Sequence, residues 1–219
     1  MEAINFDNYF KEPIADEIII KDGHAYRRDM LRVVRVLLDE NVEEEIQKTF
    51  EYKTPKEMIK YIDGKIMVGK DKKSLKELEE KPNGKFNFWT LFEKQPVYSI
   101  ILQTKQLIEL FVVQERMLRV TNQNQYKSYV KFDFENEKII MYNQEEKEER
   151  EKLLKILQKK GTIEQQEISM PFAIVNDYLK SIVDGSDRIR IDFYEQEENK
   201  QLIKISNKKK MEIIFAAKQ

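Results

Sequence analysis

The last 52 residues, 168–219, carry the clearest pattern of hydrophobic and polar positions in the chain. Apolar residues recur there with the spacing of one helix face, at Phe172, Val175, Leu179 and Ile182. Ser169 is the expected N-cap, Pro171 is expected in the first turn, and Asp184-Gly185 is the expected stop. The pattern predicts a helix that starts directly after Ser169 and extends to the stop at Asp184-Gly185.

Strict alternation follows this helix. Apolar and polar residues alternate over 188–193, which predicts a half-buried strand. The polar run 195–200 is interpreted as a hairpin turn, and two more strands are expected at 202–206 and 211–217. The C-terminal unit is therefore expected to be a helix packed on an antiparallel sheet.

Strand patterns also occur throughout the earlier sequence. Asp22-Gly23 is a typical two-residue hairpin turn between apolar segments. The segment 31–38 is rich in β-branched residues and favours a strand, although a helix over 28–38 fits the same periodicity. The expected strands are 18–21, 25–28, 31–38, 46–52, 65–68, 98–102, 126–134 and 138–142.

Four further helices are expected before the C-terminal unit, at 4–10, 54–62, 104–118 and 145–160. Thr54-Pro55 matches the start of a helix, with Met58, Ile59 and Ile62 as its apolar side. The segment 145–160 is strongly charged with a leucine stripe, and Gly161 is its expected cap. A helix that opens with proline and closes with Asp-Gly is predicted twice, at 54–66 and 170–189, and suggests two related domains.

Composition excludes several kinds of site. The 219 residues contain 39 Lys and Arg against 40 Asp and Glu, a net charge of −1, and they contain no Cys and one His. Disulfides, thiolate chemistry and the usual zinc ligand sets are therefore excluded. The N-terminus has no signal-peptide pattern, and no apolar run is long enough to span a bilayer. A soluble, cytoplasmic protein without cofactor or membrane partner is expected.

The C-terminal segments occur in an order that resembles a known family. Leu102-Gln-Thr-Lys105-Gln-Leu107-Ile108 is followed by Val130-Lys-Phe132-Asp-Phe134 and Lys138-Ile-Ile140. The helix region 168–183, the strand Arg188-Ile-Arg190-Ile-Asp-Phe193 and the closing strand 211–217 come next. This order over residues 98–219 is similar to a domain of the DNA sliding clamps, the family of the bacterial polymerase III β clamps, proliferating cell nuclear antigen and the T-even phage clamp.

The resemblance implies an α+β fold of two clamp-like domains, with antiparallel sheets outside and helices on one face. The expected division is a shortened N-terminal domain at 1–85, a connector at 86–97 and a C-terminal domain at 98–219. The implied function is that of a non-enzymatic processivity factor in DNA replication, which encircles duplex DNA without reading its sequence. Rings of this family contain six domains, so two per chain imply a homotrimer.

Two sets of residues follow from the resemblance. The inner, DNA-binding face would use basic residues of the lining helices, namely Lys11, Lys56, Lys60, Lys105, Arg116 and Lys180. The alternative for each of them is that it lies on a helix face exposed to solvent. DNA polymerase and clamp loader would bind through short peptide motifs in a pocket between the connector and the C-terminal strand. That pocket would comprise Phe88, Trp89, Leu91, Phe92, Ile213, Phe215 and Ala216, and the alternative for the aromatic residues is core packing.

Other functions leave weaker marks on the sequence. A clamp-fold scaffold that does not encircle DNA is the main alternative to a ring. Asp192 with Glu198 and Lys200 is a faint match to a metal-dependent nuclease, but the last two fall in an expected turn. No spaced glycines support a phosphate-binding loop, and His24 in its tight turn is expected at the surface. No catalytic or metal-binding residue is therefore assigned.

Overall fold

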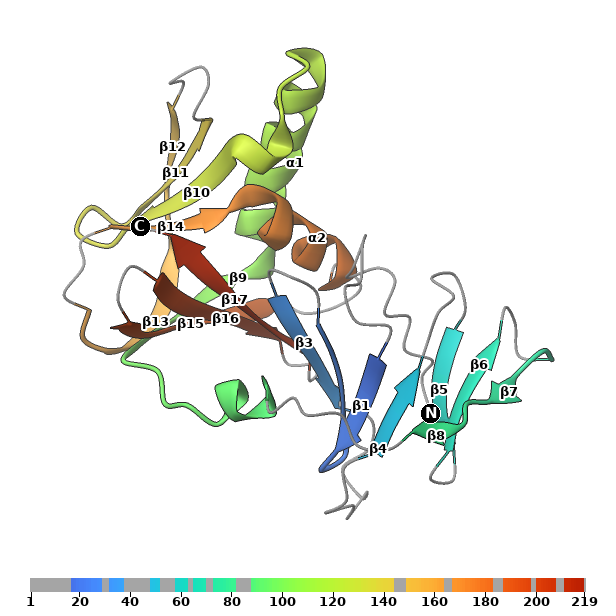
Figure 1. The fold of residues 1–219 in the computed structure, drawn as a ribbon. Coiled ribbons are helices and arrows are strands. Elements are labelled where there is room, and N and C mark those ends of the chain that lie inside the picture. The colour runs from blue at the N-terminus through green and yellow to red at the C-terminus, as the bar shows by residue number, and fades with distance from the viewer. Residues whose placement is uncertain are drawn as a thin grey trace. The chain divides into compact units, whose positions relative to one another are not determined.

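The structure of the protein is a computed structural model (Figure 1). It describes residues 17–28, 32–37, 48–51, 58–62, 65–69, 73–81, 88–143, 149–163, 167–182, 187–197, 200–207 and 211–218. The chain divides into two compact units. Unit 1 comprises residues 1–93 with 210–214, and unit 2 comprises 94–209 with 215–219. The domain boundaries expected from the sequence remain a prediction.

Residues 98–218, which belong to unit 2 except for the start of the last strand, contain the pattern strand–helix–strand–strand–strand twice in succession. The first copy is β9 (Tyr98–Gln103), α1 (Thr104–Val120), β10 (Ser128–Asp133), β11 (Lys138–Asn143) and β12 (Glu149–Leu153). The second is β14 (Glu167–Pro171), α2 (Phe172–Ile182), β15 (Arg188–Glu197), β16 (Lys200–Asn207) and β17 (Met211–Lys218). The short helix η3 (Gln125–Lys127) precedes β10, and β13 (Ile156–Gly161) joins the copies.

The two copies exchange their first strands. β9 pairs antiparallel with β15 of the second copy, and β14 pairs antiparallel with β10 of the first. In this part of the chain the strand orders are therefore β13-β9-β15-β16-β17 and β12-β11-β10-β14. The exchange also aligns Val130–Phe134 with Ile189–Phe193. Both segments consist, in order, of an aliphatic residue, a basic residue, an apolar residue, aspartate and phenylalanine.

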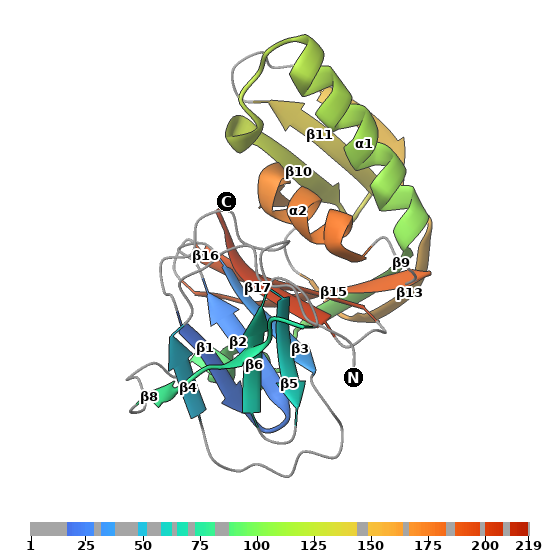
Figure 2. The same cartoon turned by 90° about the vertical axis from the view of Figure 1, so that its right-hand side faces the viewer.

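Aromatic rings fill the space between these sheets. Phe193 of β15 packs edge-on against Phe132 and Phe134 at 6.1 and 5.1 Å between centroids, and Tyr98 lies beside it. The helices lie side by side on one face of the unit (Figures 1 and 2). They are joined by Phe111 and Phe172, whose rings stack at 4.9 Å. Both strands and helices of this unit thus converge on one apolar core.

The charged helix expected at 145–160 is wrong where the structure describes it, because 149–153 and 156–161 are strands. The segment leaves one sheet as β12 and enters the other as β13, turning at the buried Leu154. Its charges pair with neighbouring elements, as in Lys138–Glu151 at 2.7 Å and Lys152–Glu109 at 3.6 Å. Sheet pairing has overridden a composition that favours helix.

Gly161 is likewise a strand residue and no helix cap. It ends β13 with a φ of +87°, and a Cβ there would overlap the carbonyl oxygen of Val97. Glycine is required at this position for both reasons.

Unit 1 repeats one of these sheets. Its strands are β1 (Glu17–Lys21), β2 (His24–Arg28), β3 (Arg32–Leu37), β4 (Lys48–Glu51), β5 (Met58–Ile62), β6 (Lys65–Gly69), β7 (Lys76–Glu77) and β8 (Glu80–Lys81), followed by the short helix η2 (Phe88–Phe92). The order β3-β2-β1-β4 matches the order β12-β11-β10-β14 of unit 2. Asp22 and Gly23 have φ of 48° and 69°, which confirms the tight turn between β1 and β2.

The helix expected at 54–62 is wrong over 58–62. That segment is β5, which pairs residue by residue with β6. The repeated helix motif proposed from the sequence is therefore absent from this described segment. Six residues separate β4 from β5, too few for a counterpart of the 11-residue α2. The internal repeat lies within unit 2 instead.

The other sequence expectations can be compared element by element. The helix over 104–118 is confirmed, as are all eight earlier strands and the three final ones, with shifts of a few residues at their ends. The C-terminal helix is also confirmed, but it begins at Phe172 instead of directly after Ser169. Ser169 is wrong as a helix cap because it lies in β14 opposite Lys131, and Pro171 ends that strand. The turn expected at 195–200 is shorter, because β15 and β16 still pair at Glu197 and Lys200. The helix expected at 4–10 and the stop at 184–185 lie outside the described residues.

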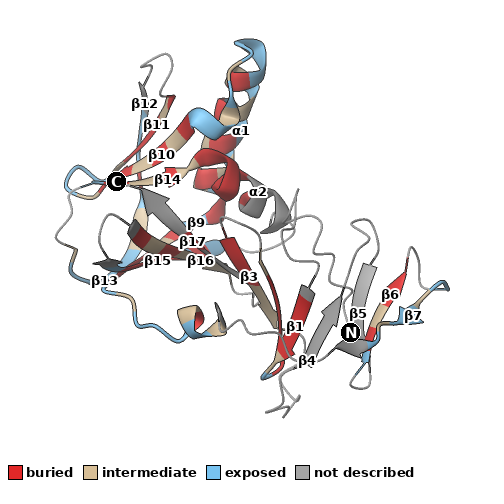
Figure 3. Ribbon diagram, viewed as in Figure 1, coloured by how far each residue is buried: buried red, intermediate tan, exposed pale blue. Residues whose placement is uncertain are grey.

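Burial alternates along β10 and β16 of unit 2, whereas β1, β2 and β3 of unit 1 each bury three consecutive residues (Figure 3). Within the residues that the structure describes, no helix combines the length and apolarity needed to cross a membrane.

Candidate functional site

The outward side of α1 is the first candidate surface. The helix buries Leu107, Phe111 and Leu118 against its unit. Its opposite side carries the exposed residues Lys105, Glu109, Val112, Val113, Arg116, Arg119 and Val120. Three cations thus share this surface with one carboxylate and three valines.

Ion pairs modify the charge that α1 presents. Glu109 lies between Lys105 at 4.0 Å and Lys152 of β12 at 3.6 Å, and Arg119 contacts Glu115 at 3.0 Å. Arg116 is exposed and makes no ion pair with the described residues. Exposed pairs of this kind are weak and open readily, so all three cations can approach an anion, with Arg116 the least hindered.

The remaining predicted DNA-binding residues are distributed differently. Lys180 lies on α2, as expected. Lys60 lies in β5, so its placement on a lining helix is wrong. Lys11 and Lys56 lie outside the described residues. The structure therefore brings Lys105 and Arg116 together on one helix, and the neighbouring α2 carries Lys180.

The aromatic turn η2 packs within unit 1. Phe92 is 6% exposed, and its ring centroid lies 5.9 Å from that of Tyr26. The Arg35 guanidinium lies 4.5 Å from the centroid of the Phe92 ring. Trp89 is half-buried, and the Lys21 ammonium lies 4.8 Å from its ring centroid. Two cation–π contacts therefore hold this turn on the β1-β2-β3 sheet.

The predicted peptide pocket stays a prediction. Phe92 is a core residue of unit 1, and Phe215 in β17 is 1% exposed. Trp89 and Leu91 keep part of their surface in solvent. Phe88 lies in η2, and Ile213 and Ala216 lie in β17. Trp89 and Leu91 are thus the members with accessible apolar surface among those whose side chains are described.

A buried polar cluster on β9, β15 and β16 was not recognised from the sequence. Asp192 is 1% exposed and accepts hydrogen bonds from Ser99 Oγ and Arg190 Nε, both at 2.6 Å. Lys204 Nζ lies 3.4 Å from its second oxygen. The signal available in the sequence was Asp133, which occupies the equivalent position in the repeated pattern. These contacts account for the buried Asp192 as a structural residue, so it need not be a metal ligand of a nuclease.

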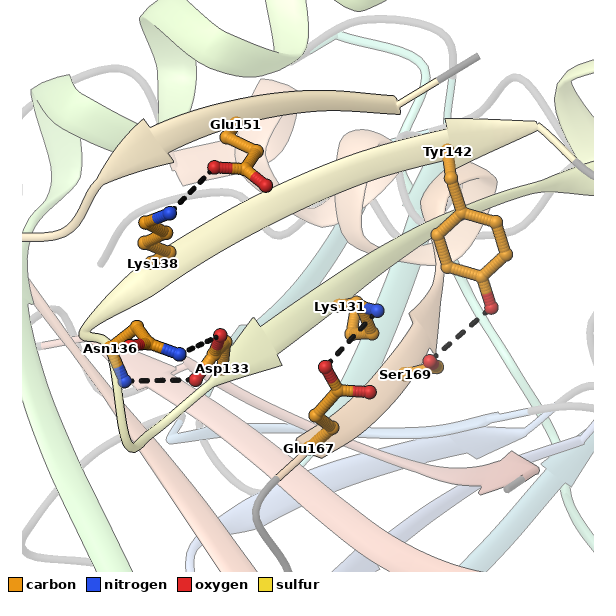
Figure 4. Close-up of polar contacts among 8 residues, drawn as sticks. All are labelled: Lys131, Asp133, Asn136, Lys138, Tyr142, Glu151, Glu167 and Ser169. Carbon is orange, nitrogen blue, oxygen red and sulfur yellow. Dashed lines mark hydrogen bonds and ion pairs between the residues drawn. The ribbon is translucent and has the colours of Figure 1, made fainter. Parts of the chain in front are cut away.

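The equivalent face of the other sheet is shown in Figure 4. Asn136 donates to Asp133 from its backbone N–H at 2.9 Å and from its side chain at 2.8 Å, and these bonds lower the pKa of that carboxyl. The hydrogen bond to Glu151 raises the pKa of Lys138. Lys131 pairs with Glu167 at 3.2 Å, and Tyr142 donates to Ser169 at 3.3 Å. This face is satisfied by its own residues and carries no cluster that resembles an active site.

Metal chemistry finds no support in the described part of the chain. Its His, Asp and Glu residues form no group of three or more that is arranged to hold a metal ion.

Comparison with known proteins gives matches in structure and none in sequence. No family model matches the chain, and no curated protein sequence matches it. The DNA polymerase sliding clamp of Bacillus subtilis superposes with a TM-score of 0.66 at 14% identity, covering 100% of this chain and 64% of that one. The DNA polymerase III subunit beta of Pseudomonas aeruginosa gives 0.61 at 13% identity, covering 100% and 65%. The beta subunit from DNA polymerase of Streptococcus pyogenes gives 0.60 at 14% identity, covering 92% and 56%.

The chain spans 56 to 65% of the length of the clamp chains that it matches. The α+β architecture expected from the sequence is confirmed, and the chain has the fold of the DNA sliding clamps.

Proposed function

We propose that this protein is a non-enzymatic sliding clamp, which closes into a ring around duplex DNA and tethers replication proteins. The observation that carries the proposal is the clamp fold, with α1 and α2 side by side and Lys105, Arg116 and Lys180 upon them. A ring needs no base contacts. Loose contacts between cations and phosphates leave it free to slide.

The strand order supports assembly between copies. β12 ends its sheet, and its outer edge pairs with no strand among the described residues. Its counterpart in unit 1 is β3, and there the start of β17, at 211–214, occupies the equivalent edge. An open edge in one unit that is filled in the other favours head-to-tail addition of a further chain.

Three copies are proposed because two clamp units per chain would then supply six. Leu153 of β12 is 74% exposed and would be buried by such an addition. Leu153→Lys is expected to shift the mass measured by light scattering towards the monomer. Val97→Lys changes an apolar residue that is 40% exposed outside β12, and it should leave the mass unchanged. If light scattering over a series of protein concentrations finds only monomer for the wild type, the self-closing ring is refuted.

Encirclement can be tested without a loading enzyme. The protein is incubated with linear duplex carrying biotin at both ends, streptavidin is then added, and retention is measured by gel filtration in high salt. A ring stays on the blocked DNA and leaves after restriction cleavage, whereas purely electrostatic binding is lost in salt. If the ends are blocked before the protein is added, a ring should not be retained. Retention that is insensitive to the order of addition would contradict encirclement.

A clamp-fold scaffold that does not encircle DNA is the second candidate. It is favoured by the valines and Glu109 among the cations of α1 and by the short connection between β4 and β5. A stable monomer that binds replication proteins but shows no end-dependent retention would select this function. Both proposals include the binding of short peptides of a polymerase and a clamp loader near Trp89 and Leu91.

A further inference from the structure

One face of the sheet β13-β9-β15-β16 collects positive charge. Directly paired residues of neighbouring strands point to the same side of a sheet. The pairings Lys160–Ser99–Asp192–Lys204 and Gln158–Ile101–Arg190–Ser206 therefore lie on one side, and Gln103 with Arg188 continues it. We call these residues the basic sheet face. It holds four cations and one carboxylate in a chain whose net charge is −1.

The charge of this face is accessible. Lys160, Arg188 and Arg190 are exposed, whereas Asp192 is 1% exposed. Asp192 and Ser99 fix the Arg190 side chain, because Nε donates to Asp192 at 2.6 Å and Nη2 donates to Ser99 at 3.2 Å. A guanidinium held in this way loses little conformational freedom when it meets an anion.

An open strand edge adjoins the charge. β13 is the last strand of its sheet, and it pairs with β9 on one side among the described residues. Its outer backbone groups can accept another extended strand. Side chains of such a strand that point to the basic side would lie beside Lys160 and Gln158. Lysine at an edge discourages neutral or basic strands and favours acidic ones.

We propose that β13 and the basic sheet face bind an acidic, extended segment of a partner protein, which adds as a further strand. A nucleic acid is the less suitable polyanion for two reasons. It cannot use the backbone groups of the β13 edge, and no exposed aromatic ring lies among the described residues of this face to stack on its bases. The proposal does not depend on ring formation, since every residue that carries it belongs to unit 2.

The test uses the full chain and a short fluorescein-labelled peptide of alternating glutamate and valine, followed by fluorescence anisotropy. Lys160→Glu is expected to weaken binding by about fivefold, since it removes one exposed attraction and adds a repulsion. Lys105→Glu makes the same charge change on α1, where the side chain is 85% exposed, and should leave peptide binding unchanged. The same peptide with alternate backbone nitrogens methylated should bind at least about tenfold more weakly, because strand addition uses those N–H groups.

The outcomes separate the possible occupants. Loss of affinity in both Lys160→Glu and the methylated peptide supports strand addition. No binding, or binding insensitive to Lys160→Glu, overturns the proposal. If the methylated peptide binds equally well, or if a single-stranded oligonucleotide of equal charge binds as tightly with the same dependence on Lys160, the face is a general polyanion surface and the proposal of a protein strand is wrong. The DNA-retention assay on Lys160→Glu should be unchanged, so failure here and failure of the ring are distinguishable.

Discussion

Asp192→Asn gives the sharpest test of how unit 2 is held together. The substitution keeps the shape of the side chain but removes a charge that is 1% exposed and is contacted by Ser99, Arg190 and Lys204. It also places an N–H₂ group where one oxygen stood, and on the Lys204 side this would set donor against donor.

The expected cost can be estimated contact by contact. A buried hydrogen bond to a charged group is worth about 1.5–3 kcal/mol, and Ser99 provides one. Arg190 is 46% exposed and can return to water, so its share is about 0–1 kcal/mol. Lys204 is 13% exposed and loses its carboxylate at 3.4 Å, which adds to the loss. Because asparagine keeps one acceptor, a net destabilisation of about 2–3 kcal/mol is expected.

Urea denaturation with two probes measures this cost where it arises. Both described α-helices lie in unit 2, so circular dichroism at the helix band reports that unit, whereas the single Trp89 reports unit 1. With a slope of about 2.5 kcal/mol per molar urea, the helix midpoint should fall by about 1 M. Asp187→Asn, an identical change at an exposed residue, should shift it little. A midpoint for Asp192→Asn within the error of the wild type would refute the structural role, and magnesium-dependent DNA cleavage lost in this variant would revive the nuclease reading.

Three further outcomes are expected. Asp133→Asn should reduce the loss of folding free energy that occurs as the pH falls. The native pKa of Asp133 is lowered, so its contribution to stability is present above the unfolded-state pKa and is lost as the pH falls through the native pKa. Acid titration followed by circular dichroism checks this. Arg116→Glu should weaken direct low-salt binding to linear duplex DNA, measured by fluorescence anisotropy, more than Lys105→Glu does, because Glu109 already offsets Lys105; equal effects would contradict the ion-pair argument. Lys21→Gln should change the emission of Trp89 by removing the cation above its ring, and an unchanged spectrum would place the ammonium elsewhere in solution.

The sequence predicted elements best where a single periodicity dominated. In α1 the apolar residues Leu107, Phe111 and Leu118 keep helical spacing, and in β15 alternation is strict over 188–193. The segment 149–161 failed because its lysines, glutamates and leucines are good helix formers in isolation. Pairing with β11 on one side and β9 on the other decided its conformation, and neither partner is local in sequence.

The candidate sites show the same limit. Lys105 and Arg116 could be placed on one helix face because their separation of 11 residues is three helical turns. The basic sheet face could not be predicted, because Lys160, Ser99 and Asp192 come from three strands whose register is set by the exchange of β9 and β14 between the two copies. The Asp192 cluster was hidden for the same reason.

The two units differ in a way that bears on how a ring would hold DNA. In unit 2 the second strand group is preceded by α2, whereas the corresponding connection in unit 1, between β4 and β5, has six residues. Within the described residues, therefore, the helical surface available to face DNA comes from α1 and α2 of unit 2. Three copies would then present six such helices, with Arg116 the least hindered cation on each α1. Because these contacts with phosphates are few, the affinity of direct DNA binding would fall only slowly with salt concentration, while topological retention would persist. The physical consequence is that closure of the ring at β12, more than attraction to phosphates, would decide how long this protein stays on DNA.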